Sequence, residues 1–326
     1  MAKQFSFPPA TSTSETIQLL SGLRKLRRQK DSPLFTLNSF FFLLLFFLSF
    51  SAVGQEKLTM AFIYPGGEGS AEEAQPILDR FFAMIREKRG PLVSGAYYPA
   101  LEEGLAAVKA GKAQAGIVSL ETYLTRKKNW PMEILLATLP AASNNQMERY
   151  FFLTTAAVSE TLEPAKPLAV YTSKAMNPVL FKSILMTNIP ADFQADFRLE
   201  TAPNLLGQLK KLASGEALGG ALLDNYEYVS LKKLDLDWVK KLKLVYSSPL
   251  VPAPPVVLFT PLPEMQKQNL IQALMALPDS LDGREVLKSF RFKGFAKPQM
   301  EAYQALDEAF ENALVAAPSI PAESPN

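Results

Sequence analysis

A pattern that occurs twice constrains the fold of this chain more than any other feature. Residues 102–124 read EEGLAAVKAGKAQAGIVSLETYL, and residues 205–229 read LLGQLKKLASGEALGGALLDNYEYV. Each predicts an amphipathic helix, a glycine turn, a short buried strand and a polar, aromatic end. Three pairs that align at an offset of 104 positions are Leu101 with Leu205, Leu105 with Leu209, and Gly111 with Gly215. One repeat is too few for a solenoid, so we expect two similar α/β lobes; coincidence between two common units is the alternative.

The ends of the two repeats are the first candidates for a binding site. In open α/β sheets, ligands bind at the carboxyl ends of the strands. Facing lobes would bring together hydroxyls, carboxylates and aromatic rings, which suit a small polar ligand. Taken singly, the serine and the aspartate are also ordinary helix N-caps, and the tyrosines could simply pack. The candidates at these ends are Ser119, Glu121, Tyr123, Asp224 and Tyr226.

Two residue types are missing from the chain, and their absence restricts the catalytic and metal-binding chemistry that it can perform. The chain of 326 residues contains neither cysteine nor histidine, while its 48% hydrophobic content is sufficient for a packed core. Without these residues there is no thiolate nucleophile, no imidazole base and no common soft metal ligand. We therefore expect a binding protein rather than an enzyme, with no catalytic residues, no metal and no cofactor.

The charge is concentrated at the N-terminus. Residues 1–54 contain six Lys or Arg residues against Glu15 and Asp31, an excess of +4, so the formal charge of +2 leaves about −2 for residues 55–326. The remainder of the chain has no basic excess for binding phosphate backbones. We expect no nucleic-acid partner.

The basic stretch precedes an apolar run, residues 40–50, and then small residues, which is the order of a secretory signal peptide. We predict that residues 1–54 are a signal peptide with a disordered start, cleaved before Gln55. An uncleaved N-terminal anchor is the alternative, because the 24 residues 32–55 carry no charge. Either reading places the rest of the chain in the periplasm or outside the cell, free or tethered to the membrane. Residues 317–326 read as a disordered tail.

Strand and helix patterns alternate along the rest of the chain. A strand at residues 58–64 leads through glycines to a helix capped by Ser70, with Glu73 three residues on. Such a loop could hold an anion, although a capping box explains its acids equally well. The alternation predicts an α/β fold.

Several quoted segments together resemble a known family. YYPALEEGLAAVKAGKAQAGIVSLETYL, LAVYTSKAMNPVLF, LLGQLKKLASGEALGGALLDNYEYV and the C-terminal run from SSPLVPAPPVVLFT to KGFAKPQMEAY occur in the order found in periplasmic substrate-binding proteins of phosphonate, phosphate and phosphite ABC transporters. The resemblance covers roughly residues 58–310. It implies a type II periplasmic binding protein, with two lobes that are each a mixed sheet flanked by helices, joined by two crossing hinge segments. Lobe one would comprise residues 55–145 and 250–316, and lobe two residues 146–249.

The resemblance also implies further ligand contacts. In this family a Ser/Thr-rich turn, usually ending in glycine, holds the phosphoryl oxygens; here Thr172 and Ser173 match it, and Lys174 stands near the place of the glycine. Lys174 could add a positive charge or block close backbone approach. Thr172 and Ser173 would open a helix whose dipole favours an anion. Tyr98 completes the predicted ligand-binding set.

The function that follows is a monomeric solute receptor. It would close on a small polar or anionic ligand, phosphonate-like or phosphate-like, and deliver it to the membrane permease of an ABC transporter. The alternative is an envelope sensor or interaction module on the same fold that no longer binds a transported ligand.

Overall fold

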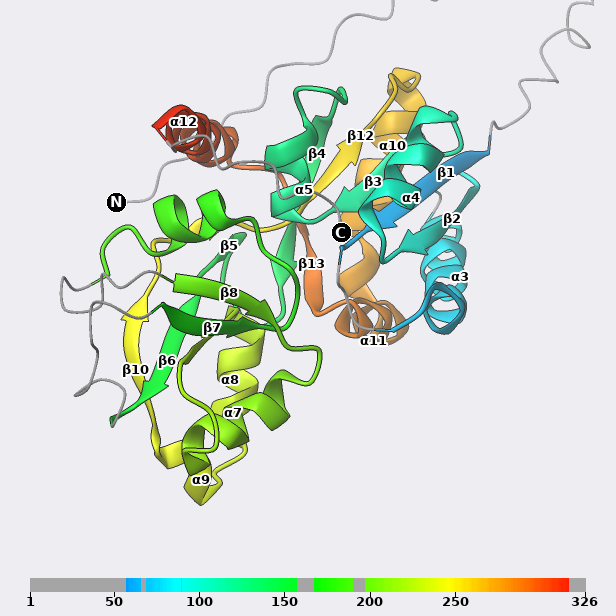
Figure 1. Cartoon of the computed structure of the whole chain (residues 1–326). Coiled ribbons are helices and arrows are strands. Elements are labelled where there is room, and N and C mark those ends of the chain that lie inside the picture. Colours follow the sequence, from blue (N-terminus) through cyan, green and yellow to red (C-terminus); the bar gives the residue numbers. More distant parts are fainter. Residues whose placement is uncertain (1–56, 66–68, 89, 157–166, 190–196, 317–326) are drawn as a thin grey trace, which may run out of the picture. The chain divides into compact units, whose positions relative to one another are not determined.

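The structure is a computed structural model that describes residues 57–65, 69–88, 90–156, 167–189 and 197–316. The predicted signal peptide or anchor and the predicted C-terminal tail lie outside the described residues. The described part contains two separate mixed sheets with helices around each (Figure 1).

The first sheet has six strands in the order β13-β4-β12-β3-β1-β2. Its strands are β1 (Leu58–Ile63), β2 (Val93–Tyr98), β3 (Ala115–Val118), β4 (Glu133–Pro140), β12 (Pro255–Leu258) and β13 (Phe292–Ala296). β1 pairs in parallel with β2 and β3, whereas β12 and β13 pair in antiparallel with their neighbours. The associated helices are α3 (Ala71–Glu87), α4 (Leu101–Lys109), α5 (Leu120–Arg126), α10 (Glu264–Met275) and α11 (Leu281–Ser289), with a short 3-10 turn at Leu277–Asp279.

Both faces of this sheet are covered, which explains the unbroken apolar sequence of β1. Met60 and Phe62 belong to a core cluster shared with α3, α10 and α11. Ala61 and Ile63 belong to a second cluster on the opposite face. Side chains alternate between the faces of a strand, so a strand buried on both sides must be apolar throughout.

The second sheet has five strands in the order β10-β6-β9-β7-β8. They are β6 (Phe151–Thr155), β7 (Leu168–Thr172), β8 (Phe197–Thr201), β9 (Gly220–Leu223) and β10 (Leu242–Ser247). Around this sheet lie α7 (Leu205–Ser214), α8 (Asn225–Lys233), α9 (Asp237–Lys240) and a π-helical turn, η2 (Leu180–Leu185).

The repeated sequence pattern corresponds to a repeated structure. The succession α4-β3-α5 in the first lobe matches α7-β9-α8 in the second, and β3 and β9 occupy equivalent places beside two parallel strands. Gly111 and Gly215 follow the equivalent helices with φ values of +68° and +79°. Glycine is favoured there because other residues rarely adopt this left-handed conformation.

Two segments connect the lobes. The chain leaves the first sheet after β4 and returns to it at β12, and the crossing segments pair through the short strands β5 (Met147–Glu148) and β11 (Val251–Pro252). The prediction of two mixed α/β lobes with two crossing segments is therefore confirmed. The lobe boundaries given above remain predictions.

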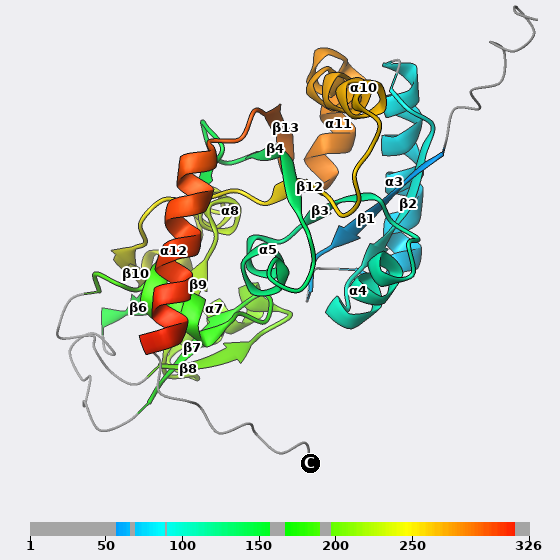
Figure 2. The same ribbon diagram turned by 90° about the horizontal axis from the view of Figure 1, so that it is seen from above.

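The last helix, α12 (Met300–Ala316), contacts elements of both lobes (Figure 2). It packs against η2 of the second lobe and against β11. Its Asp307 is paired with Lys127, just after α5 of the first lobe, and Tyr303 meets Tyr123 edge to face at 6.0 Å between ring centroids. The helix thus packs over the junction between the lobes.

The buried hydroxyl of Tyr303 ties α12 to the second crossing segment. It donates a hydrogen bond of 2.7 Å to the carbonyl oxygen of Ala253. We expect Tyr303→Phe to lower the free energy of unfolding by about 1 kcal/mol, because the carbonyl loses its buried partner. Thermal or denaturant unfolding of the variant measures this; unchanged stability would contradict it.

Candidate functional site

A cavity of about 420 Å³ is lined by residues from both lobes and from the crossing segments. Tyr64 follows β1 in the first lobe, while Ser173 and Asp224 follow β7 and β9 in the second. All three lie at carboxyl ends of parallel strands, where α/β sheets bind their ligands. The volume is within the range of small-molecule sites.

Aromatic side chains form much of the wall. They are Phe62, Tyr64, Tyr97, Tyr226, Phe290 and Phe292. Side chains of low polarity strengthen electrostatic interactions at a cavity wall. Aromatic faces also attract cations, and the cavity holds one example: the guanidinium of Arg291 lies 4.8 Å from the ring centroid of Tyr226.

Carboxylates outnumber ammonium and guanidinium groups on the lining. The acids are Glu73, Glu148 and Asp224, and the bases are Lys174 and Arg291. Burial, together with the charges of Asp224 and Glu227, raises the pKa of Glu148 to about 7, against the opposing effect of Lys174. Glu148 is therefore about half protonated at neutral pH, and a further positive charge in the cavity would favour its ionised form.

Two more acids surround the same lysine. Burial raises the pKa of Glu227, as does Asp224, while a hydrogen bond from Ser173 and the charge of Lys174 oppose the increase. Burial also raises the pKa of Glu121, and the backbone of Asn177 and Lys174 oppose it. Lys174 therefore lies near acids from both lobes and from the crossing segment.

Four of the nine predicted ligand-binding residues line this cavity. They are Ser173, Lys174, Asp224 and Tyr226. Asp224 is also the N-cap of α8, where it forms a capping box with Glu227. The remaining five, which are not among the lining residues, are Tyr98, Ser119, Glu121, Tyr123 and Thr172.

Local hydrogen bonds and packing account for these positions. Ser119 caps α5, accepting from the Thr122 amide and donating to its hydroxyl. The Thr172 hydroxyl donates to the Lys174 carbonyl at 2.7 Å. Tyr123 is only 8% exposed and packs in the core.

Tyr98 packs against the core cluster that contains Ala61, and its neighbour Tyr97 lines the cavity. Successive side chains of a strand point to opposite faces, so only one of the two can face the cavity from this strand. Glu121 lies close enough to Lys174 to sense its charge.

The helix that follows the turn at Thr172 begins later in the sequence than expected. Thr172 and Ser173 do not open it; helical structure starts at Pro178, and the side-chain oxygen of Asn177 accepts from the amides of Val179 and Leu180. The prediction that Thr172 and Ser173 lie at a helix N-terminus is therefore wrong. Pro178 suits the first helical position because it has no amide to satisfy.

Sequence reasoning missed several lining residues. Tyr64 follows β1 at its carboxyl end, so the strand-end rule that selected Ser119 could have found it. Glu148 lies in a crossing segment, and Arg291 lies in the turn before β13. No sequence signal placed either of them at this cavity.

The hydroxyl of Tyr64 is the clearest sign of a missing partner. Its oxygen is buried and has no hydrogen-bond partner among the described residues. Burial raises the pKa of Tyr64 well above its ordinary value, with a further contribution from Glu148, so the group is a neutral donor. Buried hydroxyls are normally paired, and this one can meet a ligand or solvent only if a movement of the ring or the lobes makes its oxygen accessible.

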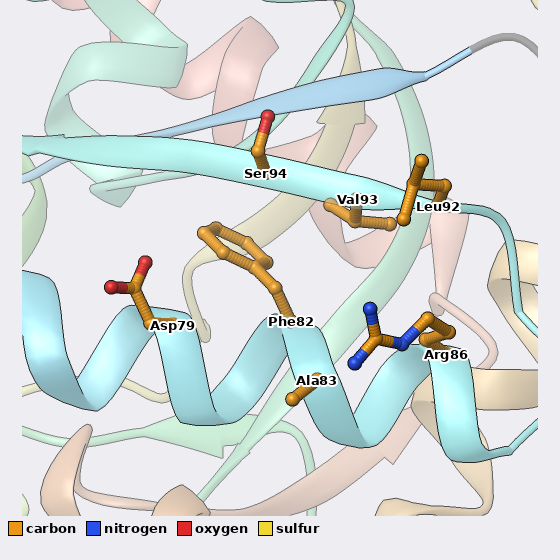
Figure 3. A pocket seen from close by; sticks show the side chains of 7 residues that line it. All are labelled: Asp79, Phe82, Ala83, Arg86, Leu92, Val93 and Ser94. Atoms are coloured by element: carbon orange, nitrogen blue, oxygen red, sulfur yellow. The ribbon is translucent and has the colours of Figure 1, made fainter.

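A second, smaller pocket does not have these properties. It has a volume of about 140 Å³ and lies between α3 and β2, with Asp79, Phe82 and Arg86 on the helix side and Ser94 on the strand side (Figure 3). All of its lining comes from one lobe. Movement of one lobe relative to the other would therefore not change this pocket directly.

Within the described ranges, no group of three potential metal-binding side chains comes together. The described helices also include none with the length and hydrophobicity needed to cross a bilayer.

Comparison with known families identifies the chain's relatives. The profile of the family described as "ABC transporter, phosphonate, periplasmic substrate-binding protein" matches residues 69–303. The chain belongs to this family. Its members bind small-molecule ligands, act with ABC permeases and are periplasmic, so the predicted resemblance and solute-binding role are confirmed. A search of curated proteins found no significant match.

Solved structures show the same fold at low sequence identity. A binding protein of an ABC phosphonate transporter from Pseudomonas aeruginosa has 16% identity and a TM-score of 0.58, covering 82% of this chain and 91% of that chain. PhnD1 from Prochlorococcus marinus, in complex with methylphosphonate, has 10% identity and a TM-score of 0.58, covering 79% and 98%. A Xanthomonas citri protein bound to ATP has 13% identity and a TM-score of 0.59, covering 80% and 99%. The expected type II periplasmic binding fold is thereby confirmed.

Tyr64 and Tyr303 provide a matched pair of hydroxyl deletions. We expect Tyr64→Phe to leave the free energy of unfolding unchanged or slightly higher, because an unpaired buried hydroxyl is removed. The same change should weaken ligand binding about tenfold, whereas Tyr303→Phe should lower stability. Unfolding and calorimetric titration of both variants measure these effects. A destabilised Tyr64→Phe protein with unchanged affinity would show that the hydroxyl serves the fold.

Proposed function

We propose that this chain captures a small ligand that carries both an oxyanion and a protonated amine, and delivers it to an ABC permease. The observation that supports this most directly is the excess of carboxylates in an aromatic cavity between the lobes. A bare phosphate or simple phosphonate would be repelled by Asp224 and Glu148. A ligand that brings its own ammonium group removes that repulsion.

The amine is assigned to the side of the cavity near Glu148 and Asp224. Burial and the neighbouring acids Asp224 and Glu227 raise the pKa of Glu148, so its ionised form would gain from a further positive charge. A bound ammonium would supply that charge and favour ionised Glu148. Aromatic side chains nearby would contribute cation–π attraction to the same group.

The oxyanion is assigned to the hydrogen-bond donors of the lining, of which Tyr64 and Lys174 lie close enough to Glu148 to interact electrostatically with it. Tyr64 offers its unpaired hydroxyl, and Lys174 offers an ammonium. Ser70 lines the same cavity at the N-terminus of α3, a helix of 17 residues whose dipole favours negative charge. The Glu73 carboxylate accepts a hydrogen bond from the Ser70 amide at this helix start and reduces that effect, so the Tyr64 hydroxyl and the Lys174 ammonium carry more of the interaction.

The same proposal includes how the receptor operates. It acts as a monomer without catalytic activity or nucleic-acid partner. A signal peptide cleaved before Gln55 releases it into the periplasm. N-terminal sequencing of the exported protein checks the cleavage site, and an intact leader would favour a membrane tether instead.

The hydrogen bonds in the turn at Thr172 favour a second candidate, an envelope sensor or interaction module. The Thr172 hydroxyl is bonded to the carbonyl of Lys174, and the amides at the following helix start are capped by Asn177. A site with these donors occupied would bind simple oxyanions weakly. Absence of binding across the ligand series below, with a folded protein, would support this candidate.

Two ligands that differ only in the amine test the proposal. Calorimetric titration should show that 2-aminoethylphosphonate binds at least tenfold more tightly than ethylphosphonate at pH 8. Equal affinities would contradict the amine assignment. In Glu148→Gln, which keeps the shape and removes the charge, this preference should decrease to a few fold.

The pH dependence of the same preference has a definite sign. Glu148 has a pKa of about 7, so it is mostly protonated at pH 6 and mostly ionised at pH 8. Only the ionised form attracts an ammonium, and the ratio of the two affinities should therefore fall as the pH decreases from 8 to 6. The ammonium group lowers the second pKa of the phosphonate, so the two ligands do not ionise at the same pH and the ratio keeps a contribution from this difference. Glu148→Gln retains that contribution and lacks the carboxyl group, so the ratio in the unsubstituted protein should fall relative to the ratio in the variant. Parallel profiles in the two proteins would exclude Glu148 as the titrating group.

A further inference from the structure

Arg291 and Tyr226 contact each other from different lobes. Arg291 lies in the turn between α11 and β13 of the first lobe, and Tyr226 lies in the first turn of α8 in the second. The carbon Cζ of the guanidinium is 4.8 Å from the centroid of the tyrosine ring, and both residues line the cavity. This is a cation–π contact between lobes at the wall of the binding site.

The fold holds Arg291 in an uncommon backbone conformation. Its φ is +60°, in the left-handed region that residues other than glycine rarely adopt. Its amide donates to the carbonyl of Lys288 at 3.0 Å, and its carbonyl accepts from the amide of Ala141 at 2.8 Å. Strained conformations persist where surrounding contacts determine them, so the position of this side chain is set by its neighbours.

A second contact joins the same parts of the molecule. The side-chain amide of Asn225 donates to the carbonyl of Ala142 at 2.7 Å. Ala142 follows Ala141, which is bonded to Arg291, and Asn225 precedes Tyr226. The first turn of α8 is thus attached at two adjacent points to the structure around the end of β4.

We propose that Arg291, Tyr226 and Asn225 form an interlobe clasp that holds the lobes together before a ligand binds. These contacts involve only groups of the protein, so they stabilise the joined arrangement without a ligand. If the competent arrangement is already populated, less of the binding free energy is spent on closure and the apparent affinity is higher. The clasp therefore raises the apparent affinity by favouring the arrangement in which both lobes meet the ligand.

The chemistry of the clasp predicts which substitutions matter. The guanidinium contacts the ring face, so Tyr226→Phe should keep the contact and Tyr226→Leu should remove it. Arg291→Met retains an unbranched side chain but removes the charge. Asn225→Ala removes the hydrogen bond to Ala142 while leaving both partners of the cation–π contact.

The distance between the lobes in the ligand-free protein tests the clasp directly. The chain has no cysteine, so spin labels can be attached at Lys112→Cys and Glu216→Cys, which lie at exposed, equivalent turns of the two lobes. We expect Arg291→Met, Tyr226→Leu and Asn225→Ala each to lengthen or broaden the distance distribution. Tyr226→Phe should match the unsubstituted protein. Unchanged distributions in all three disrupting variants, with cooperative unfolding retained, would overturn the proposal.

Affinity provides a second measurement, and this part rests on the proposed function. With 2-aminoethylphosphonate as the probe, Arg291→Met and Tyr226→Leu should each weaken binding about three- to tenfold. The double variant should lose less affinity than the product of the two single fold-losses, because both substitutions remove the same contact. If the probe does not bind at all, the proposed ligand is wrong while the ligand-free distances still decide the clasp. Independent, fully multiplicative losses would overturn the pairing of Arg291 with Tyr226.

Discussion

The direction of the parallel strands determines where the functional side chains lie. In each lobe the three parallel strands end at the same edge of the sheet, and the residues that follow them lie together there. The β5–β11 pairing joins the crossing segments between the two sheets. The edges supply Tyr64, Ser173 and Asp224 to one cavity, and a crossing segment adds Glu148. The site is therefore a consequence of the same chain plan used twice.

The need to compensate buried charges is a second constraint on the ligand that the cavity can bind. Several carboxyl groups lie in or near an aromatic cavity around Lys174, and burial raises the pKa of Glu148 and Glu227. A buried carboxylate is stable only when paired or protonated. An oxyanion alone worsens this imbalance, whereas a ligand with its own amine corrects it. The proposed specificity rests on two groups near the cavity, the buried carboxyl of Glu148 and the buried hydroxyl of Tyr64.

Particular residues show where sequence reasoning succeeded and where it stopped. Asp224 and Ser173 were found because strand ends and the family turn are visible in the sequence. Ser119 satisfies the same strand-end rule and caps a helix as Asp224 does, but it is not among the residues that line the cavity. A capping residue and a ligand contact have the same local sequence, and only three-dimensional neighbours distinguish them.

The sequence by itself determined the class of the molecule. The repeat separated by 104 positions predicted two lobes of one plan, the absence of cysteine and histidine restricted the chemistry, and the order of segments indicated the family. Periodicity and turn residues are local properties, so they can be read from a single chain.

Only the tertiary structure decided which tyrosine of the Tyr97–Tyr98 pair faces the cavity, and that Glu148 and Arg291 belong to it. It also brought Arg291 to Tyr226, a residue 65 positions away in the sequence. The reason is that such contacts depend on how separate elements pack and how acids perturb one another across space. Local pattern carries no information about either.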